Sequence, residues 1–88
     1  MAQHQVSAGV GPGFDPKSLS IKSGDCVRWT VVHGTHTITA DDGSFDSGPL
    51  AVGESFDRDF PVAATCPYYC KYHGDPGGVG MSGVVVVE

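Results

Sequence analysis

Short segments of alternating hydrophobic and polar residues run along the chain, and clusters of Gly, Pro and Asp separate them. The clearest alternation is at residues 26–32, CVRWTVV, where Val27, Trp29 and Val31 fall on one face. A period of two predicts a strand with one buried face. Other strand-like segments are the β-branched residues 35–40, the alternating residues 54–60, the aromatic residues 66–70 and the valine-rich residues 82–88.

No apolar repeat of helical period occurs, so these segments predict an all-β protein. Many short strands with Gly/Pro turns are typical of a sandwich, and we expect a Greek-key β-sandwich of about seven to eight strands. The valines of residues 82–88 fit a strand buried on both sides. Arg58 shares a face with Phe56 and Phe60, so it either reaches out from a rim or marks a wrong register. We expect His4 to lie in a flexible start of the chain.

Length and charge narrow the class of protein. The 88 residues predict one domain, residues 1–88, and a domain this small gains from a metal, a disulfide or a partner. The net charge of -5 argues against a nucleic-acid partner, because phosphate binding needs basic patches. We find no apolar run long enough for a membrane span and no signal peptide. We interpret the sequence as a mature domain or an excised fragment.

Three cysteines, Cys26, Cys66 and Cys70, leave at least one thiol unpaired. A disulfide between Cys26 and Cys66 would stabilise the fold by roughly 3–4 kcal/mol. Strand alternation opposes it, because Cys26 should face outward and Cys66 should face inward. Both alternatives remain open on the sequence.

A thiol, an imidazole and a thioether lie within twelve residues, at Cys70, His73 and Met81. Sulfur donors favour a soft or borderline metal, and two His, one Cys and a weak axial Met form the blue-copper arrangement. The second histidine must come from elsewhere in the chain. His36 directly precedes a β-branched strand, so we favour it over His33.

These segments resemble the plastocyanin-like cupredoxins. PYYCKYHGDPGGVGMSGVVVVE is similar to the family's C-terminal ligand loop and last strand: an aromatic strand ends in Cys, His follows after two residues, and Gly-Met-x-Gly leads into valines. THTITADDGSFDSGPLAVGESFDRDF resembles the first-ligand segment, and FDPKSLSIKSGDCVRW resembles the early strands. The resemblance covers about Phe14 to Glu88. It implies one type 1 copper ion with four ligands: His36, Cys70, His73 and Met81.

Two features depart from the family pattern. Plastocyanins usually place four residues between the second His and the Met, whereas seven separate His73 from Met81 here. We expect the extra residues to bulge at residues 75–78. Cys66 stands where the family often has Tyr.

The resemblance implies a carrier of single electrons rather than an enzyme. We expect a monomer outside the cytoplasm that docks transiently with protein redox partners near His73. One alternative is a zinc or copper-storage site built from His33, His36, Cys70 and His73. Another is an accessory copper domain of a larger redox complex. We interpret the acidic residues as a solvated face rather than a docking patch: Asp41, Asp42, Asp46, Asp57 and Asp59.

Overall fold

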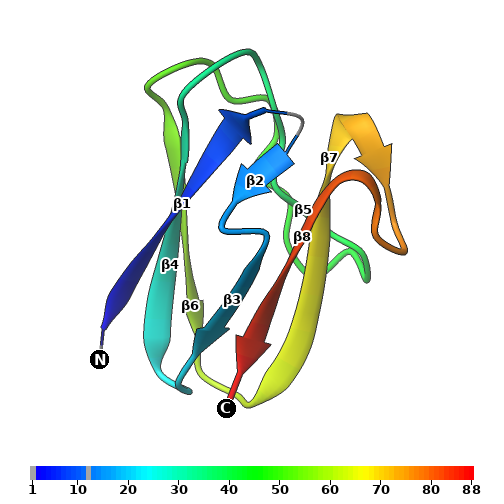
Figure 1. Ribbon diagram of the computed structural model, residues 1–88. Helices are drawn as coiled ribbons and strands as arrows, with labels where there is room; N and C mark the ends of the chain where they lie inside the picture. The colour runs from blue at the N-terminus through cyan, green and yellow to red at the C-terminus, as the bar shows by residue number, and fades with distance from the viewer. Residues whose placement is uncertain (1, 12) are drawn as a thin grey trace.

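Within the described part of the chain, eight strands form two four-stranded sheets that pack face to face (Figure 1). The structure is a computed structural model that describes residues 2–11 and 13–88. The first sheet has the order β2-β1-β4-β6 and the second the order β3-β8-β7-β5. The strands are β1 (Gln3–Val10), β2 (Gly13–Asp15), β3 (Ser18–Ile21), β4 (Asp25–Val31), β5 (Thr39–Ala40), β6 (Ser55–Phe60), β7 (Ala64–Asp75) and β8 (Val79–Val87). Over these described residues no helix is long and apolar enough to cross a membrane.

Strand β4 supplies the centre of the core, as its alternation predicts. Val27 and Trp29 are fully buried and Val31 nearly so, while the intervening residues are half-buried on the outer face. The Trp29 ring meets Tyr68 of the opposite sheet edge to face, with centroids 5.3 Å apart. Burial raises the pKa of the Tyr68 hydroxyl to about 12. The two sheets are therefore joined by an aromatic contact two residues before Cys70 on β7.

The start of the chain is a strand, so the expectation of a flexible start around His4 is wrong. Strand β1 pairs in parallel with β4 from Gln3 opposite Cys26 to Ala8 opposite Val31. His4 Nε2 also lies 3.0 Å from an Asp25 carboxylate oxygen. Parallel pairing joins segments that are far apart in sequence, and local alternation does not show it.

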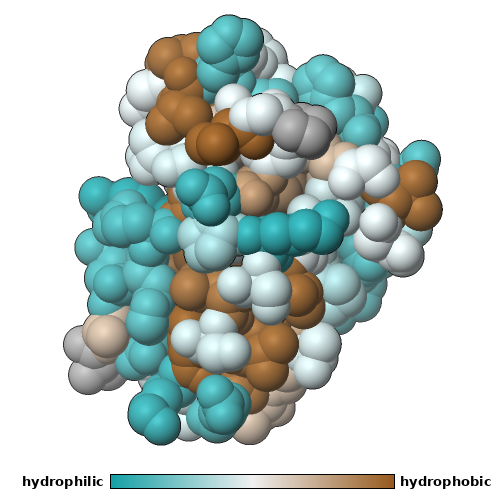
Figure 2. Space-filling view, in the orientation of Figure 1, coloured by the Kyte–Doolittle hydropathy of each residue, from teal (hydrophilic) through white to brown (hydrophobic). Residues whose placement is uncertain are grey.

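The C-terminal valines alternate in burial, which corrects the expectation of a strand buried on both sides. Val85 and Val87 face the core, whereas Val84 and Val86 are half-buried on the other face. The second sheet has the first sheet on one side only, so its outer face stays partly open. On the face shown in Figure 2, hydrophobic residues gather in the lower half around β3, which is an edge strand of the second sheet.

Arg58 lies at a rim of the sandwich, on the same face as Phe56 and Phe60, so the expected register is right. It pairs with Val27 across the sheet and is half-buried. Its guanidinium carbon lies 4.7 Å from the centroid of the Phe45 ring, within cation–π range. The charge thus covers core aromatics at the sheet edge instead of entering the core.

All three cysteines are free thiols. Cys26 is on the outer face of β4, and Cys66 packs against the core from β7 in the other sheet. Burial raises the pKa of both thiols, and Asp59 adds to this at Cys26. The structure therefore favours separate thiols over the disulfide.

The two ends of the chain meet at one end of the sandwich, beside the start of β4. Cys26 N–H donates to the Ala2 carbonyl oxygen, and Ser23 N–H donates to that of Glu88, each at 3.0 Å. Strand β4 then leads to the opposite end, where the segment with His33 and His36 follows it. Figure 1 shows both termini at the bottom of the view and the β7 end of the ligand loop at the top.

Candidate metal centre

An irregularity in the β7–β8 pairing builds most of the site. Tyr69 pairs with Ser82 and Gly74 with Gly80, so four residues of β7, 70–73, oppose Met81 alone. A bulge bends the strand and redirects its side chains. The extra residues between His73 and Met81 were expected to bulge at residues 75–78, and residues 76–78 form a turn there, at the tip of a hairpin that β7 and β8 continue beyond the site.

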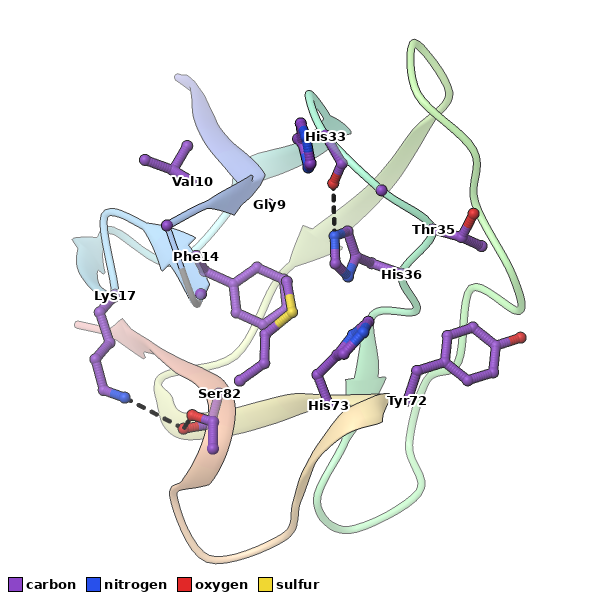
Figure 3. Close-up of a pocket in the computed structure, with 15 residues that line it drawn as sticks. Gly9, Val10, Phe14, Lys17, His33, Thr35, His36, Tyr72, His73 and Ser82 are labelled. Carbon is purple, nitrogen blue, oxygen red and sulfur yellow. Dashed lines mark hydrogen bonds between the residues drawn. The ribbon is translucent and has the colours of Figure 1, made fainter.

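Three atoms that could hold a metal ion converge at this bulge. Cys70 Sγ lies 3.7 Å from His36 Nδ1 and 3.6 Å from His73 Nδ1. All three atoms lie within 4.8 Å of one another. Cys70 is fully buried and His36 is 7% exposed, whereas His73 is exposed at the surface. Figure 3 shows the two imidazole rings turned toward a shared space.

A backbone carbonyl orients the His36 ring. His36 Nε2 donates to the carbonyl oxygen of His33 at 2.7 Å, drawn as a dashed line in Figure 3. Since the carbonyl only accepts, the proton is on Nε2 and the lone pair of Nδ1 faces Cys70. The segment is fixed further by the pair of backbone hydrogen bonds between His36 and Leu50.

The Cys70 sulfur accepts a hydrogen bond from the His36 segment. Thr37 N–H points to Cys70 Sγ at 3.5 Å, and both residues are buried. A hydrogen bond to a ligand sulfur withdraws electron density from it, which is one means of tuning a metal centre. Thr37 therefore connects the segment of His36 directly to Cys70.

Met81 is 2% exposed and lines the same surface pocket as His36 and His73. The two strands of the hairpin approach closely beside it, because both facing positions, Gly74 and Gly80, lack a side chain. A Cβ at Gly74 would lie 2.5 Å from the Met81 carbonyl oxygen. The hairpin is also held at its turn, where Gly77 N–H donates to Asp41 Oδ2 at 2.9 Å.

The donor set suits copper. It offers a cysteine sulfur, two imidazole nitrogens and a nearby thioether, and the cluster includes no carboxylate. Soft sulfur with imidazole selects copper or zinc over calcium and magnesium. The alternative zinc set is not assembled, because His33 is not a member of the cluster and contributes its carbonyl instead.

Some polar residues around the site were missed in the sequence. Asp41 and Asp46 were assigned to a solvated face, yet Asp41 binds the hairpin turn and Asp46 pairs with Lys71 beside Cys70. The acceptor role of the His33 carbonyl was also missed. Backbone acceptors and contacts between distant loops leave no local pattern, so no signal in the sequence marked them.

Comparison with known proteins places the chain in a family. No protein-family model matches it. Plastocyanin of Scenedesmus fuscus is 33% identical over 87 residues, an alignment that covers 85% of this chain and 86% of the relative. The chain belongs to the plastocyanin-like cupredoxin family. A purple cupredoxin from Nitrosopumilus maritimus is 29% identical and superposes over the full length of both chains with a TM-score of 0.79.

The wider cupredoxin fold is matched as well. Amicyanin in its reduced Cu(I) form superposes with a TM-score of 0.82 at 23% identity, covering 97% of this chain and 81% of that one. These matches and the eight strands in two sheets confirm the expected all-β cupredoxin fold. Membership of the family indicates a blue copper electron carrier, in agreement with the function expected from the sequence.

Proposed function

We propose that His36, Cys70, His73 and Met81 hold one copper ion and that the chain carries single electrons between protein partners. The observation that supports this most directly is the convergence of two imidazole Nδ1 atoms on one buried thiol sulfur, at 3.7 and 3.6 Å. A copper ion bound there supplies one-electron chemistry between Cu(I) and Cu(II).

The chain itself supplies a site that changes little in shape. His36 is held by the His33 carbonyl and Cys70 by the Thr37 amide, and both ligands lie in or beside the core. A ligand set held rigidly needs little rearrangement when the charge of the site changes. The fold thus keeps the reorganisation that accompanies electron transfer small.

His73 is the proposed exit for the electron, because it is the one exposed residue of the three-residue cluster. Exposed apolar residues lie near it in the chain and around the pocket: Val10 is 44%, Tyr72 54% and Val79 55% exposed. A small surface of this kind suits transient redox complexes, which bury little area. We therefore place the docking of redox partners around His73.

We further propose that residues 1–88 are one copper-binding domain that acts as a monomer outside the cytoplasm and catalyses no reaction of its own. The family relationship supports this proposal, as does a site whose proposed ligands all come from one sandwich. Transfer through the His73 edge requires no substrate-binding residue.

Addition of Cu(II) to the metal-free protein tests the function. We expect one equivalent to give an intense visible band, which Zn(II) does not give, and a reversible one-electron wave in voltammetry. Cys70→Ser should abolish the band while the circular dichroism of the fold persists, because the thiolate is the donor of the band. A Cys70→Ser protein that stays blue, or a parent protein that binds copper without a reversible wave, would contradict the proposal; the latter indicates storage.

A further inference from the structure

Four polar residues beside the candidate metal centre form a closed ring of hydrogen bonds. Lys71 N–H donates to Thr37 Oγ1 at 2.9 Å, and the hydroxyls of Thr37 and Thr39 lie 3.0 Å apart. Thr39 Oγ1 donates to Asp46 Oδ1 at 3.2 Å, and Asp46 Oδ2 pairs with Lys71 Nζ. The ring starts and ends at Lys71, the residue after Cys70.

The Asp46 carboxylate determines which group donates and which accepts in each hydrogen bond of the ring. Lys71 Nζ beside Asp46 holds the pKa of that carboxyl below its ordinary value, so the carboxylate only accepts. Thr39 must then use its single proton toward Asp46, so its oxygen accepts from the Thr37 hydroxyl. The Thr37 oxygen keeps its lone pairs for the Lys71 amide. Hydrogen bonds aligned in this way strengthen one another.

The two hydroxyls of the ring are buried, and Asp46 connects them to the surface. Thr37 is 2% and Thr39 5% exposed, whereas the side chain of Asp46 is 39% exposed. A buried hydroxyl without a fixed acceptor costs free energy and can rotate to another partner. By accepting from Thr39, the Asp46 carboxylate fixes the rotation of both hydroxyls. Thr37, which carries one of them, also donates its amide N–H to Cys70 Sγ.

We propose that Asp46 is a positioning residue of the metal centre, acting through Thr39 and Thr37. It holds the segment that follows His36 against the segment that follows Cys70 and so maintains the hydrogen bond from the Thr37 amide to the Cys70 sulfur. This inference rests on the proposed function, since a positioned sulfur matters most when it binds a metal. The same turn supplies Asp41 to the hairpin, so residues 41–46 brace the ligand loop at two points.

Asp46→Leu tests the inference, because leucine has a similar size and no acceptor. In the metal-free protein, we expect hydrogen exchange at the Lys71 amide to become at least about tenfold faster, as measured by NMR. In the copper-loaded protein, we expect the reduction potential to fall relative to that of Asp42→Asn. A sulfur with a weaker hydrogen bond carries more electron density and favours Cu(II).

Asp42→Asn is the matched control, because it removes one negative charge from the same turn. Asp42 is exposed at the surface and accepts from Ser44, within the turn itself. It should leave Lys71 exchange unchanged and report the effect of charge alone on the potential. Asp46→Asn retains an acceptor oxygen for Thr39 and should recover most of the Lys71 protection.

Thr39→Val keeps the test decisive if Asp46→Leu does not fold, since it interrupts the ring without a change of charge. It should speed exchange at Lys71 and lower the potential relative to the parent. Parent-like exchange at Lys71 in Asp46→Leu or Thr39→Val would overturn the inference, and so would equal potentials in Asp46→Leu and Asp42→Asn. A parent protein without a blue band would overturn the proposed function itself.

Discussion

His33 and His36 stand three residues apart, and the chain uses a different part of each. His36 presents its ring nitrogen to Cys70, while His33 presents its backbone carbonyl to the far side of that ring. The imidazole of His33 has no part in the cluster. The distinction separates the proposed metal ligand, His36, from a residue that only fixes the orientation of its ring, and it can be tested.

His36→Gly should remove the blue band of the copper protein, and added imidazole should restore it by entering the vacated position. His33→Gly should retain the band, because glycine keeps the carbonyl that orients His36. Visible absorption with and without imidazole measures both effects. A blue His36→Gly protein together with a colourless His33→Gly protein would exchange the two roles.

Met81 should act as a weak axial ligand. We expect Met81→Leu to keep the blue colour and raise the reduction potential, because loss of a weak donor disfavours Cu(II) more than Cu(I). Met81→Gln should lower the potential, since an oxygen donor favours Cu(II). Voltammetry of the two variants provides the measurement, and potentials equal to that of the parent would show that Met81 is not bound.

The grouping of His36, Cys70 and His73 was predictable from the sequence, whereas the contacts that support it were not. The spacing of Cys70, His73 and Met81 showed the donor types directly, and the β-branched residues after His36 distinguished it from His33. The carbonyl of His33 and the carboxylate of Asp46 act through contacts between loops. Such contacts depend on tertiary structure and produce no spacing that a single sequence reveals.

At the scale of elements, the β7–β8 hairpin accommodates the seven residues between His73 and Met81 without loosening the site. The extra residues pair with each other, from Gly74 opposite Gly80 to Asp75 opposite Val79. The four-against-one bulge then places the proposed ligands Cys70, His73 and Met81 at the base of the hairpin. The approach of the two strands at Gly74 is therefore a requirement of the site.

Gly74→Ala should distort this approach, since its methyl group would lie 2.5 Å from the Met81 carbonyl oxygen and 2.8 Å from its nitrogen. Backbone atoms cannot turn away as a side chain can, so we expect a loss of about 1–3 kcal/mol in the free energy of unfolding and weaker copper binding. Urea unfolding and copper titration measure the two effects. Gly13→Ala is the control, because the same methyl group there meets nothing within 4 Å; equal losses in both variants would refute the requirement.

The sequence predicted some strands more accurately than others. The alternation of residues 26–32 located β4 within a residue, because one face of the strand is buried in the core and the other is only half-buried. The β-branched residues 35–40 form only a two-residue strand, since Thr37 uses its amide and hydroxyl on Cys70 and Lys71. Strand β1 has few large apolar residues, and its partner β4 lies more than twenty positions away.

At the scale of the whole molecule, Asp25 joins the start of the chain to the rest of the fold. Its carboxylate accepts from Ala2 N–H at 2.9 Å, lies 3.0 Å from His4 Nε2, and accepts from Lys22 N–H at 3.1 Å. Together these hydrogen bonds hold the pKa of Asp25 well below its ordinary value of 3.8, with the Ala2 amide as the largest cause.

A depressed pKa contributes stability above the pKa of the unfolded chain, and acid removes this stability as the pH falls through the folded value. Asp25→Asn should therefore be less stable than the parent at neutral pH, and the difference should shrink below about pH 4. Urea unfolding at pH 7 and pH 3 measures the two differences. A gap that is equally large at both pH values would show that the charge of Asp25 is not responsible.

The free cysteines give a second prediction at this scale. Since Cys26 and Cys66 occupy different sheets and face different ways, a reductant should leave the unfolding temperature of the metal-free protein unchanged. Thermal unfolding with and without dithiothreitol checks this. A fall in the unfolding temperature on reduction would establish the disulfide that strand alternation opposes.

The position of the two chain ends has a practical consequence for how this carrier can be attached. Ala2 and Glu88 lie beside the start of β4, and the candidate copper site lies past its other end. A strand of seven residues, as β4 is, spans roughly 20 Å. A flexible linker of n residues fused to either end would have a root-mean-square end-to-end distance of about 5–6 Å × √n. Immobilised by such a linker on an electrode or beside a second redox protein, the molecule would still turn His73 outward.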